Sequence, residues 1–335
     1  MRLVSNYFRG AEIKVMPKKI WVTWEDQPRN ESMSKEMGAK LFKIDINKNR
    51  LHRYFHSIVL TLKIFYREKP EIIFVENPSI VLALIGVIYG IIFRVKIVID
   101  QHNAGIYPLE GRSKILNHLA MIIARLAFCN IVSNIGLQKY VCSAGIKAFV
   151  IADPIPNLEK EYQNIELSDK LNIVNICSFS DDEPYNEVIK AAEYLEKEAS
   201  FYITGNFREK IKNEINYKNI TFTGYLERDD YLNLLASADL IIVLTLRENC
   251  LLCGAYEALF FEKPLILSRK NALIDYFGDA AIYCENRAED IAEKVLWAKN
   301  NMGIMKGKII LGRKNIEIKW GEQMEVFNKY IELIA

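Results

Sequence analysis

The chain has 335 residues, which exceeds one ordinary hydrophobic core and is enough for two domains. Its 44 Lys and Arg nearly balance its 42 Asp and Glu, so the net charge gives no reason to expect nucleic acid as a partner. Six cysteines do not make a disulfide scaffold in a chain of this length, and the longest apolar run, residues 80–93, is shorter than the roughly 20 residues that span a bilayer. Because the N-terminus also carries charge before any apolar run, we expect a soluble cytoplasmic protein, with peripheral contact to the inner face of a membrane left open.

The first half of the chain alternates short β-branched runs with longer helical stretches. After the second run, Asn-Pro-Ser at residues 77–79 provides a helix start, and the apolar helix at 80–93 leads into the next run. Repeated units of this kind predict a parallel sheet with helices on both faces. The strands expected here are residues 20–23, 72–76, 96–100, 130–133 and 149–151.

The pattern pauses at residue 156, and the polar, acidic segment 157–170 indicates a connection between domains. A second series of strands and helices follows in residues 171–313, and the tail, 314–335, is an amphipathic helix. We therefore expect two Rossmann-like, doubly wound α/β domains, 1–156 and 171–313, with a ligand cleft between them at the carboxyl ends of the strands. The second-half strands are expected at residues 172–177, 201–204, 220–223, 240–244, 264–267 and 281–284, and the helices at 184–198, 230–236, 254–261, 272–277 and 288–300.

Cys250 and Cys253 form the single CxxC of the chain. Structural zinc needs four ligands, and the other four cysteines are isolated and distant in sequence from the histidines. The flanking residues also differ from a thioredoxin-type redox site. We interpret the pair as two small apolar side chains that pack at a helix start.

Two carboxylates flank this motif, Glu248 in the loop after strand 240–244 and Glu257 in the first turn of a helix that begins near Gly254. A helix N-terminus attracts phosphate, and a glycine lets phosphate approach the backbone closely. A carboxylate in each position could accept hydrogen bonds from the hydroxyls of a ribose and of a sugar. The spacing alone leaves open a plainer interpretation, in which one Glu supplies helix N-terminal charge and the other is a solvated loop residue.

The stretch RENCLLCGAYEALFFEKPLILS resembles the donor-binding signature of retaining glycosyltransferases of the GT-B fold, in the family 4-like group. The segments ICSFSDDEPYNEVIKAAEYL, FYITGN, ITFTGYLERDDYLNLLASADLIIVLT and ALIDYFGDAAIYCE follow the order of that group's elements. The resemblance implies that Glu257 binds the nucleotide ribose and Glu248 the donor sugar, that Thr223-Gly224-Tyr225 lies against the nucleobase, and that the C-terminal helix returns to the N-terminal domain.

Two positions depart from the pattern of the group. Eight residues separate the glutamates where seven are common, and an acidic turn, residues 178–183, replaces a basic pair that neutralises the donor diphosphate. Asp181 or Asp182 is expected to cap the helix after this turn, and an Asp-x-Asp metal site is disfavoured because that device belongs to the other large glycosyltransferase fold. Cations for the diphosphate could come from Arg208 and Lys210 or from Arg247. The expected donor-binding set is Glu257, Gly254, Asn249, Ser180, Arg208, Lys210, Gly224, Tyr225 and Arg247.

The N-terminal half resembles the group more weakly, which suits a domain that binds variable acceptors. His102 follows strand 96–100 at its carboxyl end, where a structural role and a role beside the donor sugar are both open. The resemblance favours the second, so His102 and Glu248 are the expected catalytic residues. Arg29, Asn30 and Asn103 are the expected acceptor-binding residues.

Residues 48–69, KNRLHRYFHSIVLTLKIFYREK, interleave Lys, Arg and His with aromatic side chains on a helical pattern. Such a helix can lie on an anionic membrane surface, and it can equally be an ordinary surface helix with one buried face. If the first holds, the acceptor is a lipid-linked sugar.

The resemblance implies a hexosyltransferase that moves a sugar from a nucleotide-sugar donor to a glycan or lipid-linked acceptor, with retention, in the synthesis of cell-surface polysaccharide or glycolipid. Retention of this type needs no protein nucleophile, and neither a metal nor another cofactor is expected. Two alternatives stay open, a nucleotide-sugar epimerase and a nucleotide-sugar-binding subunit without turnover. A dinucleotide oxidoreductase is disfavoured because no GxGxxG follows a strand.

Overall fold

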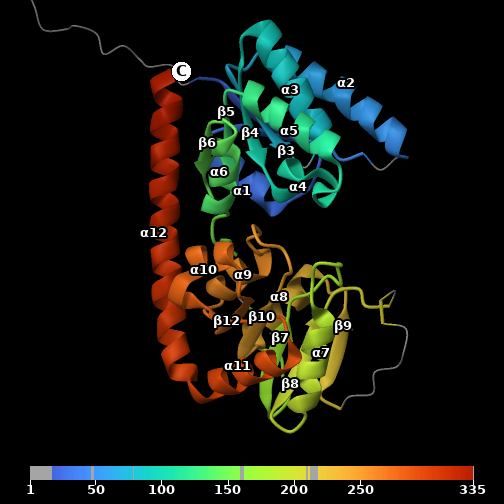
Figure 1. Ribbon diagram of the computed structural model, residues 1–335, viewed down its shortest axis with the longest axis vertical. Coiled ribbons are helices and arrows are strands. Elements are labelled where there is room, and N and C mark those ends of the chain that lie inside the picture. The colour runs from blue at the N-terminus through green and yellow to red at the C-terminus, as the bar shows by residue number, and fades with distance from the viewer. Residues whose placement is uncertain are drawn as a thin grey trace, which may run out of the picture.

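The computed structural model describes residues 17–46, 49–77, 79–158, 162–208, 210–211 and 218–334. These residues form two α/β domains, one above the other in Figure 1, and the long helix α12 (Met302–Ile334) runs along one side of both. In the described part of the chain, each domain is built on a six-stranded parallel sheet flanked by helices. The predicted fold class is therefore confirmed.

The N-terminal sheet has the strand order β2-β1-β3-β4-β5-β6. The order in which strands are added to this parallel sheet changes side between β1 and β3. Four of its strands are buried almost throughout, which is why they are readable in the sequence as short β-branched runs. The strands are β1 (Lys19–Thr23), β2 (Lys40–Lys43), β3 (Ile72–Asn77), β4 (Lys96–Gln101), β5 (Cys129–Val132) and β6 (Ala148–Val150). The helices are α1 (Pro28–Glu36), α2 (Arg50–Glu68), α3 (Ile80–Phe93), α4 (Asn103–Ile106), the 3₁₀ turn η1 (Pro108–Gly111), α5 (Lys114–Leu126) and α6 (Ile135–Ser143).

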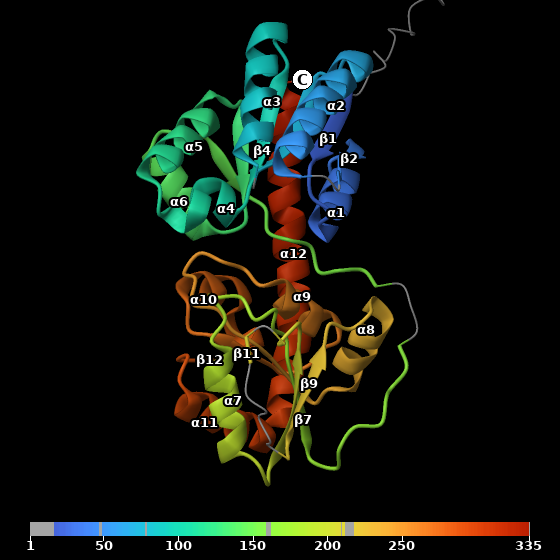
Figure 2. The ribbon, with the colours of Figure 1, turned by 90° about the vertical axis from the view of Figure 1, so that its right-hand side faces the viewer.

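Different helices cover the two faces of the N-terminal sheet. Helices α2, α3 and α5 contribute Phe65, Leu82 and Ile123 to the core on one face, where they meet strand residues such as Val75. Helices α1 and α12 cover the other face. Figure 2 looks onto the first of these layers, with α2, α3 and α5 in front of the sheet and α12 behind it.

The C-terminal sheet has the strand order β12-β11-β10-β7-β8-β9. The order in which strands are added to this parallel sheet changes side between β7 and β10. One face is covered by α7 and α11, and the other by α8, α9, α10 and the first half of α12. The strands are β7 (Leu171–Asn175), β8 (Ala199–Thr204), β9 (Ile220–Gly224), β10 (Leu240–Val243), β11 (Leu265–Ser268) and β12 (Ile282–Cys284). The helices are α7 (Tyr185–Tyr194), α8 (Arg228–Ser237), α9 (Cys253–Phe260), α10 (Asn271–Phe277), the 3₁₀ turn η2 (Gly278–Ala280) and α11 (Ala288–Asn300).

In the part of the chain that the structure describes, two segments cross between the domains, and they touch each other. The first is the strand exit at residues 151–153, and the second is α12, which buries Ile309 and Ile316 in the C-terminal core and Phe327 in the N-terminal core. The Trp320 indole donates to the carbonyl of Ala152 at 3.1 Å, which joins the two crossings. The C-terminal helix thus packs back on the N-terminal domain, and it begins at Met302, earlier than the expected 314.

Most predicted elements agree with the structure to within one or a few residues. Strand β2 was not predicted, because KLFK is four residues long and has exposed lysines at both ends. The predicted caps of α7 are wrong: its N-cap is Pro184 without a side-chain hydrogen bond, and Asp181 and Asp182 pair elsewhere. Both carboxylates therefore stabilise contacts between loops instead of a helix end.

Candidate functional site

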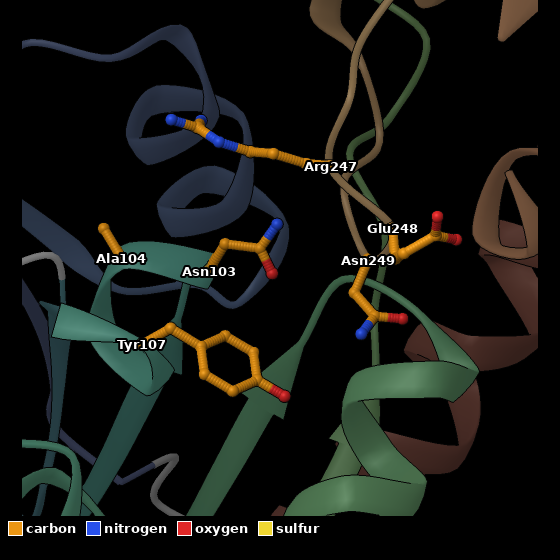
Figure 3. Close-up of a pocket in the computed structure, with 6 residues that line it drawn as sticks. All are labelled: Asn103, Ala104, Tyr107, Arg247, Glu248 and Asn249. Atoms are coloured by element: carbon orange, nitrogen blue, oxygen red, sulfur yellow. The ribbon is translucent and has the colours of Figure 1, made fainter. Parts of the chain in front are cut away.

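A pocket of about 280 Å³ opens between the two domains. Asn103, Ala104 and Tyr107 from α4 and the residue that follows it form one wall, and the loop between β10 and α9 forms the other (Figure 3). That loop leaves β10 beside β7, at the point where the strand order of the C-terminal sheet reverses. Parallel α/β sheets bind ligands at such a point, so the pocket lies where the topology predicts a site. The loop residues that line it are Arg247, Glu248 and Asn249.

The β10–α9 loop also contacts the N-terminal domain directly. The Asn134 side chain donates to the carbonyl of Asn249 at 3.2 Å, while its oxygen accepts from Leu137 N at 2.9 Å as the N-cap of α6. The Cys250 thiol interacts with the side chain of Asn103. The predicted residues Asn103 and Asn249 therefore lie on opposite walls of one pocket, and Tyr107 is a wall residue that the sequence analysis missed.

Glu257 lies in the second turn of α9, not the first, because the helix begins at Cys253. Its Oε2 accepts a hydrogen bond of 2.5 Å from the Tyr231 hydroxyl on α8. Burial raises the pKa of Glu257, and the Tyr231 hydrogen bond and the charge of Arg228 oppose that rise. Oε1 has no protein hydrogen-bond partner among the residues that the structure describes, so a ligand hydroxyl could donate to it.

Gly254 is buried in the first turn of α9. A side chain at this position would approach Ile176, which follows β7, with its Cβ 2.8 Å from the Ile176 Cδ1. The glycine therefore allows α9 to pack closely against the end of β7. Close packing is a second reason for glycine here, beside the predicted approach of a phosphate.

The two charged loop residues of the pocket are both in ion pairs. Glu248 accepts from Lys270, the N-cap residue of α10, at 2.7 Å, and Arg247 lies 3.3 Å from Asp182. The Glu248 carboxylate is largely exposed and points away from Asn103 (Figure 3). Lys270 was not predicted, and it is the cation that the structure places beside Glu248.

The turn between β7 and α7 is the acidic turn that replaces the expected basic pair, and its Glu183 carboxylate is bound within the turn itself. Glu183 Oε2 accepts from the backbone N–H groups of Ser178 and Ser180 at 2.9 and 2.8 Å, and from the Ser178 hydroxyl at 3.0 Å. Phe179 between them has a φ of 61° and is buried among other aromatic rings. The backbone N–H groups of Ser178 and Ser180 in this turn therefore already donate to the Glu183 carboxylate.

The remaining predicted donor residues lie at the carboxyl ends of β8 and β9. Gly224 has a φ of 73°, in the region that favours glycine, and its carbonyl accepts from Gly205 N at 3.0 Å. Tyr225 follows it with an 83% exposed side chain, free to stack on a ring. Lys210 binds Asp181 at 2.6 Å, and Arg208 is exposed on the same connection.

The N-terminal wall is backed by buried charges. His102 follows β4, and its Nε2 lies 3.5 Å from both Glu76 Oε1 and Asp100 Oδ2. Burial alone would lower the pKa of His102, but the Asp100 hydrogen bond and charge, together with Glu76, raise it. Burial also raises the pKa of Glu76, against hydrogen bonds from Thr23 and Asn30. The two carboxylates therefore favour the protonated form of His102, and burial favours the protonated form of Glu76.

Arg29 and Asn30, the predicted acceptor residues, are both buried in the N-terminal domain. Arg29 donates to both oxygens of Asp100, at 2.9 and 2.8 Å, to the carbonyl of Ile151 at 3.0 Å, and to Asp153. Burial opposes ionisation of Asp100, yet the Arg29 charge and hydrogen bonds lower its pKa strongly. Asn30 is similarly bound by Trp21 and Glu76. The placement gives both residues structural partners and does not favour a direct acceptor contact.

Among the described residues, four buried polar atoms near His102 have no partner in hydrogen-bond geometry: Glu76 Oε1, Asn77 Oδ1, His102 Nε2 and Asn103 Oδ1. Two of them, Glu76 Oε1 and His102 Nε2, contact each other only as the 3.5 Å ion pair. The four atoms come from the carboxyl ends of β3 and β4, which pair in register with Asn77 opposite Gln101. Buried polar groups are normally satisfied, and exceptions concentrate at functional sites. The N-terminal wall therefore has both donors and acceptors for a polar ligand.

The CxxC cysteines are free thiols. Burial raises the pKa of Cys250, which makes it a weaker nucleophile at neutral pH. Across the described ranges, no group of three or more His, Cys, Asp or Glu is arranged to hold a metal ion.

A protein-family model described as glycosyl transferases group 1 matches residues 158–308. The matched segment covers nearly all of the C-terminal domain, including Glu248, Gly254 and Glu257. A search of curated proteins finds no match to the chain. Residues 158–308 are therefore similar to the group 1 glycosyltransferases, which supports the predicted resemblance at that coarser level.

Solved structures share the two-domain arrangement. Sucrose-phosphate synthase from Thermosynechococcus elongatus has a TM-score of 0.71 and 13% identity, over 88% of this chain and 83% of that chain. Anabaena Alr3699/HepE in complex with UDP has a TM-score of 0.65 and 13% identity, over 94% and 98%. A putative UDP-N-acetylglucosamine 2-epimerase from Listeria monocytogenes has a TM-score of 0.56 and 11% identity, over 87% and 90%. These likenesses show a GT-B fold.

Proposed function

We propose that the protein is a glycosyltransferase that moves a sugar from a nucleotide-sugar donor to an acceptor hydroxyl with retention of anomeric configuration. The observation that carries the proposal is that the group 1 glycosyltransferase match contains the loop and helix that form one wall of the interdomain pocket. Anabaena Alr3699/HepE, which has the same fold, was solved with UDP, and this supports a uridine nucleotide as the first donor to test.

Three residues of the C-terminal wall are assigned to the donor in this proposal. Glu257 accepts from the ribose hydroxyls through its unpartnered Oε1, and Tyr231 holds the carboxylate in place. Glu248 accepts from hydroxyls of the donor sugar when it exchanges Lys270 for the ligand. This exchange is feasible because Glu248 is exposed and its ion pair lies partly in solvent, where such pairs are weak.

Charge stabilisation of the leaving diphosphate falls to Lys270 and to backbone N–H groups in this proposal, with Arg208, Lys210 and Arg247 as the other cations near the site. The Lys270 Nζ lies 2.7 Å from Glu248 Oε1, so it would be close to a donor sugar bound at Glu248. His102, held between Glu76 and Asp100, supplies a positive charge on the opposite wall. A retaining transfer of this kind relies on positioning and electrostatics, because the acceptor oxygen forms the new bond as the diphosphate departs from the same face.

The acceptor is proposed to be a glycan or lipid-linked sugar, in cell-surface polysaccharide or glycolipid synthesis at the inner face of a membrane. The unpartnered Oδ1 of Asn103, which lines the N-terminal wall of the pocket, can accept a hydrogen bond from one of its hydroxyls.

An epimerase is the second candidate, because His102 between two carboxylates is a group that could move a proton at a sugar carbon. A binding subunit without turnover is the third, because Glu183 occupies the N–H donors of the β7–α7 turn. The three candidates differ in their products: a transferase releases a nucleoside diphosphate, an epimerase changes the sugar without releasing it, and a binding subunit does neither.

The first test is a thermal-shift screen with UDP-, GDP- and ADP-sugars on the wild type, Glu257→Ala and the control Glu322→Ala, an exposed α12 residue. A matching donor at about 100 times its Kd should raise Tm by roughly 5 °C in the wild type and the control, and much less in Glu257→Ala. The donor assignment fails if no nucleotide-sugar stabilises the wild type, or if Glu257→Ala is stabilised equally. Diphosphate release with the selected donor, and NMR of the product anomer, then separate the three candidates and test retention.

A further inference from the structure

The outer surface of α2, α3 and α5 is unusually apolar. Of the 26 exposed large hydrophobic side chains among the described residues, 13 lie on these three helices, which have 19, 14 and 13 residues. Leu51 and Ile115 are more than 80% exposed, and Tyr66 is 76% exposed. Scattered exposed hydrophobic residues are normal, but this concentration on one layer is not.

The exposed residues follow helical stripes that are separate from the buried ones. On α5, Ile115, Leu119, Ile122 and Leu126 recur at intervals of four, three and four residues and face solvent, while Ala120, Ile123 and Ala124 face the core. A helix that only covers a sheet carries polar residues on its outer face. Helix α5 has apolar stripes on both faces, so its outer stripe is unexplained by the fold.

Helix α2 repeats the arrangement with a longer stripe. Leu51, Phe55, Leu62 and Tyr66 recur at four, seven and four residues on the solvent side, and Phe65 packs into the core. Between them, α3 adds Ile88, Ile91, Ile92 and Phe93 at its exposed C-terminal end. These side chains have no partner in the described structure that would remove them from water.

The three helices form one continuous layer. The rings of Phe65 on α2 and Tyr89 on α3 lie 4.9 Å apart, and the Tyr89 hydroxyl donates to the carbonyl of Phe65 at 3.2 Å. Helix α3 packs in turn against α5, and Figure 2 shows α2, α3 and α5 together on the side of the domain opposite α12. We call the outer surface of this layer the basic apolar face.

The helices that form this face are predominantly basic. Residues 49–69, 79–94 and 111–127, which include the ends of the helices, contain nine Lys and Arg and a single acidic residue, Glu68. One of the nine, Arg112, lies near enough to the other domain for its charge to add to the Lys210 hydrogen bond that lowers the pKa of Asp181. Glu68 is itself in ion pairs with Lys18, Lys40 and Arg67. Subtraction from the totals of 44 and 42 leaves 35 basic and 41 acidic residues in the rest of the chain, so the positive charge is concentrated here.

We infer that the basic apolar face binds the surface of an anionic phospholipid bilayer. Apolar side chains that enter the headgroup region, flanked by Lys and Arg that contact lipid phosphates, are the two components of such binding. The helices lie on the surface and do not cross it: within the described residues, none is long and apolar enough to span a membrane. This binding does not depend on the proposed reaction.

The charge favours a bilayer over a second copy of the chain as the occupant. A symmetric dimer through this face would bring two predominantly basic surfaces together, which is unfavourable without anions between them. The face also extends to the edge of the cleft. Its most exposed large hydrophobic residues, Leu51 and Ile115, lie in the first turns of α2 and α5. The turn η1, which precedes α5, directly follows the pocket residue Tyr107. A bilayer on this face would thus lie beside the pocket.

The test is co-sedimentation of the full chain with vesicles of phosphatidylglycerol and phosphatidylcholine, compared with phosphatidylcholine alone. We expect at least a tenfold preference for the anionic vesicles at low salt, and at least a tenfold loss of binding in about 0.5 M NaCl. The triple variant Leu51→Ser/Tyr66→Ser/Ile115→Ser should bind at least tenfold more weakly. Arg53→Gln/Lys63→Gln/Lys114→Gln should do the same, because each basic residue near the surface contributes about fivefold.

The matched control is Leu311→Ser/Ile318→Ser/Val326→Ser, which replaces three side chains of about 60% exposure on α12, away from the face. It should bind like the wild type, and all variants should keep the wild-type Tm because the substituted residues are exposed. The inference is overturned if anionic vesicles bind no better than neutral ones, or if both face variants bind as the control does. It is also overturned if light scattering shows a dimer that the apolar variant dissociates, since a second copy then covers the face. Donor binding, measured without vesicles, is a separate readout that should be unchanged in both face variants.

Discussion

The two walls of the cleft carry their charges in contrasting ways. On the N-terminal wall, the Arg29 and Asp100 side chains are 5% and 1% exposed and are joined by two hydrogen bonds. On the C-terminal wall, the Glu248–Lys270 and Arg247–Asp182 pairs each have one partly exposed member, Glu248 at 61% and Arg247 at 46%. One wall is fixed by its ion pairs, whereas the pairs of the other can be exchanged for a ligand.

The contrast shows which wall of the cleft is held rigidly and which can change its contacts. A buried pair is costly to break because the remaining charge has no water, whereas an exposed pair costs little because water replaces the lost partner. The N-terminal wall therefore sets the position of His102, and the C-terminal loop can rearrange its contacts at low cost. Changes to the two walls should accordingly affect different properties.

The largest expected effect is on stability, at Arg29. Arg29→Ala leaves Asp100 buried without a counter-charge and should lower the free energy of unfolding by about 3–5 kcal/mol. Arg247→Ala, on the exposed wall, should lower it by about 1 kcal/mol or less. Urea unfolding of both variants measures the difference, and equal losses would remove the distinction between the walls.

The next effect concerns pH and His102. Its pKa is raised above the ordinary 6.5, so its protonation stabilises the folded state fully below pH 6.5, and this contribution is lost as the pH rises through the folded-state pKa. The stability difference between wild type and His102→Gln should therefore be greatest in acid and decrease toward alkaline pH. Urea unfolding across that range tests the sign, with His118→Gln on α5 as the control. A difference that grows with pH would mean that burial outweighs the two carboxylates.

The smallest effect is expected at Tyr231. Tyr231→Phe removes the hydrogen bond to Glu257 and should weaken donor binding by about fivefold, the equivalent of about 1 kcal/mol. It should also raise the pKa of Glu257 further, because that hydrogen bond favours the ionised form, so the loss should be larger in acid. Titration calorimetry measures both. Tyr194→Phe, which removes a Tyr–Glu contact with Glu289 outside the cleft, is the matched control and should leave donor binding unchanged.

The sheets and the general position of the site were accessible from the sequence because their causes are local. Strands buried on both faces become β-branched runs, and the carboxyl end of each run marks the edge of the sheet where a site forms. Strand β2 was missed because an edge strand of four residues has too little burial to leave a pattern. Glu257 was assigned to the first turn instead of the second because the helix begins one residue before the expected start, and a helix start is defined only to within a residue or two.

The partners of the site residues were not accessible, because they are distant in sequence. Tyr231 and Glu257 are 26 residues apart, and Arg29 and Asp100 are 71 apart. Nothing in the local pattern around Arg29 distinguishes an arginine buried against an aspartate from one that is free to bind an acceptor. Similarly, 48–69 was identified as a basic aromatic helix, but only the fold places α3 and α5 beside it to make one surface.

Helix α12 has a mechanical consequence for the whole molecule. With 33 residues it is about 50 Å long, and it is anchored in both cores, so pulling the domains straight apart would have to break it. Gly321 lies in this helix next to the Trp320 bond to Ala152, and a side chain there would meet nothing within 4 Å. The two connections between the domains, residues 151–153 and α12, thus lie together along one edge of the molecule, which we call the spine. The domains can pivot about that spine more easily than they can slide, and the displacement of any cleft residue grows with its distance from α12.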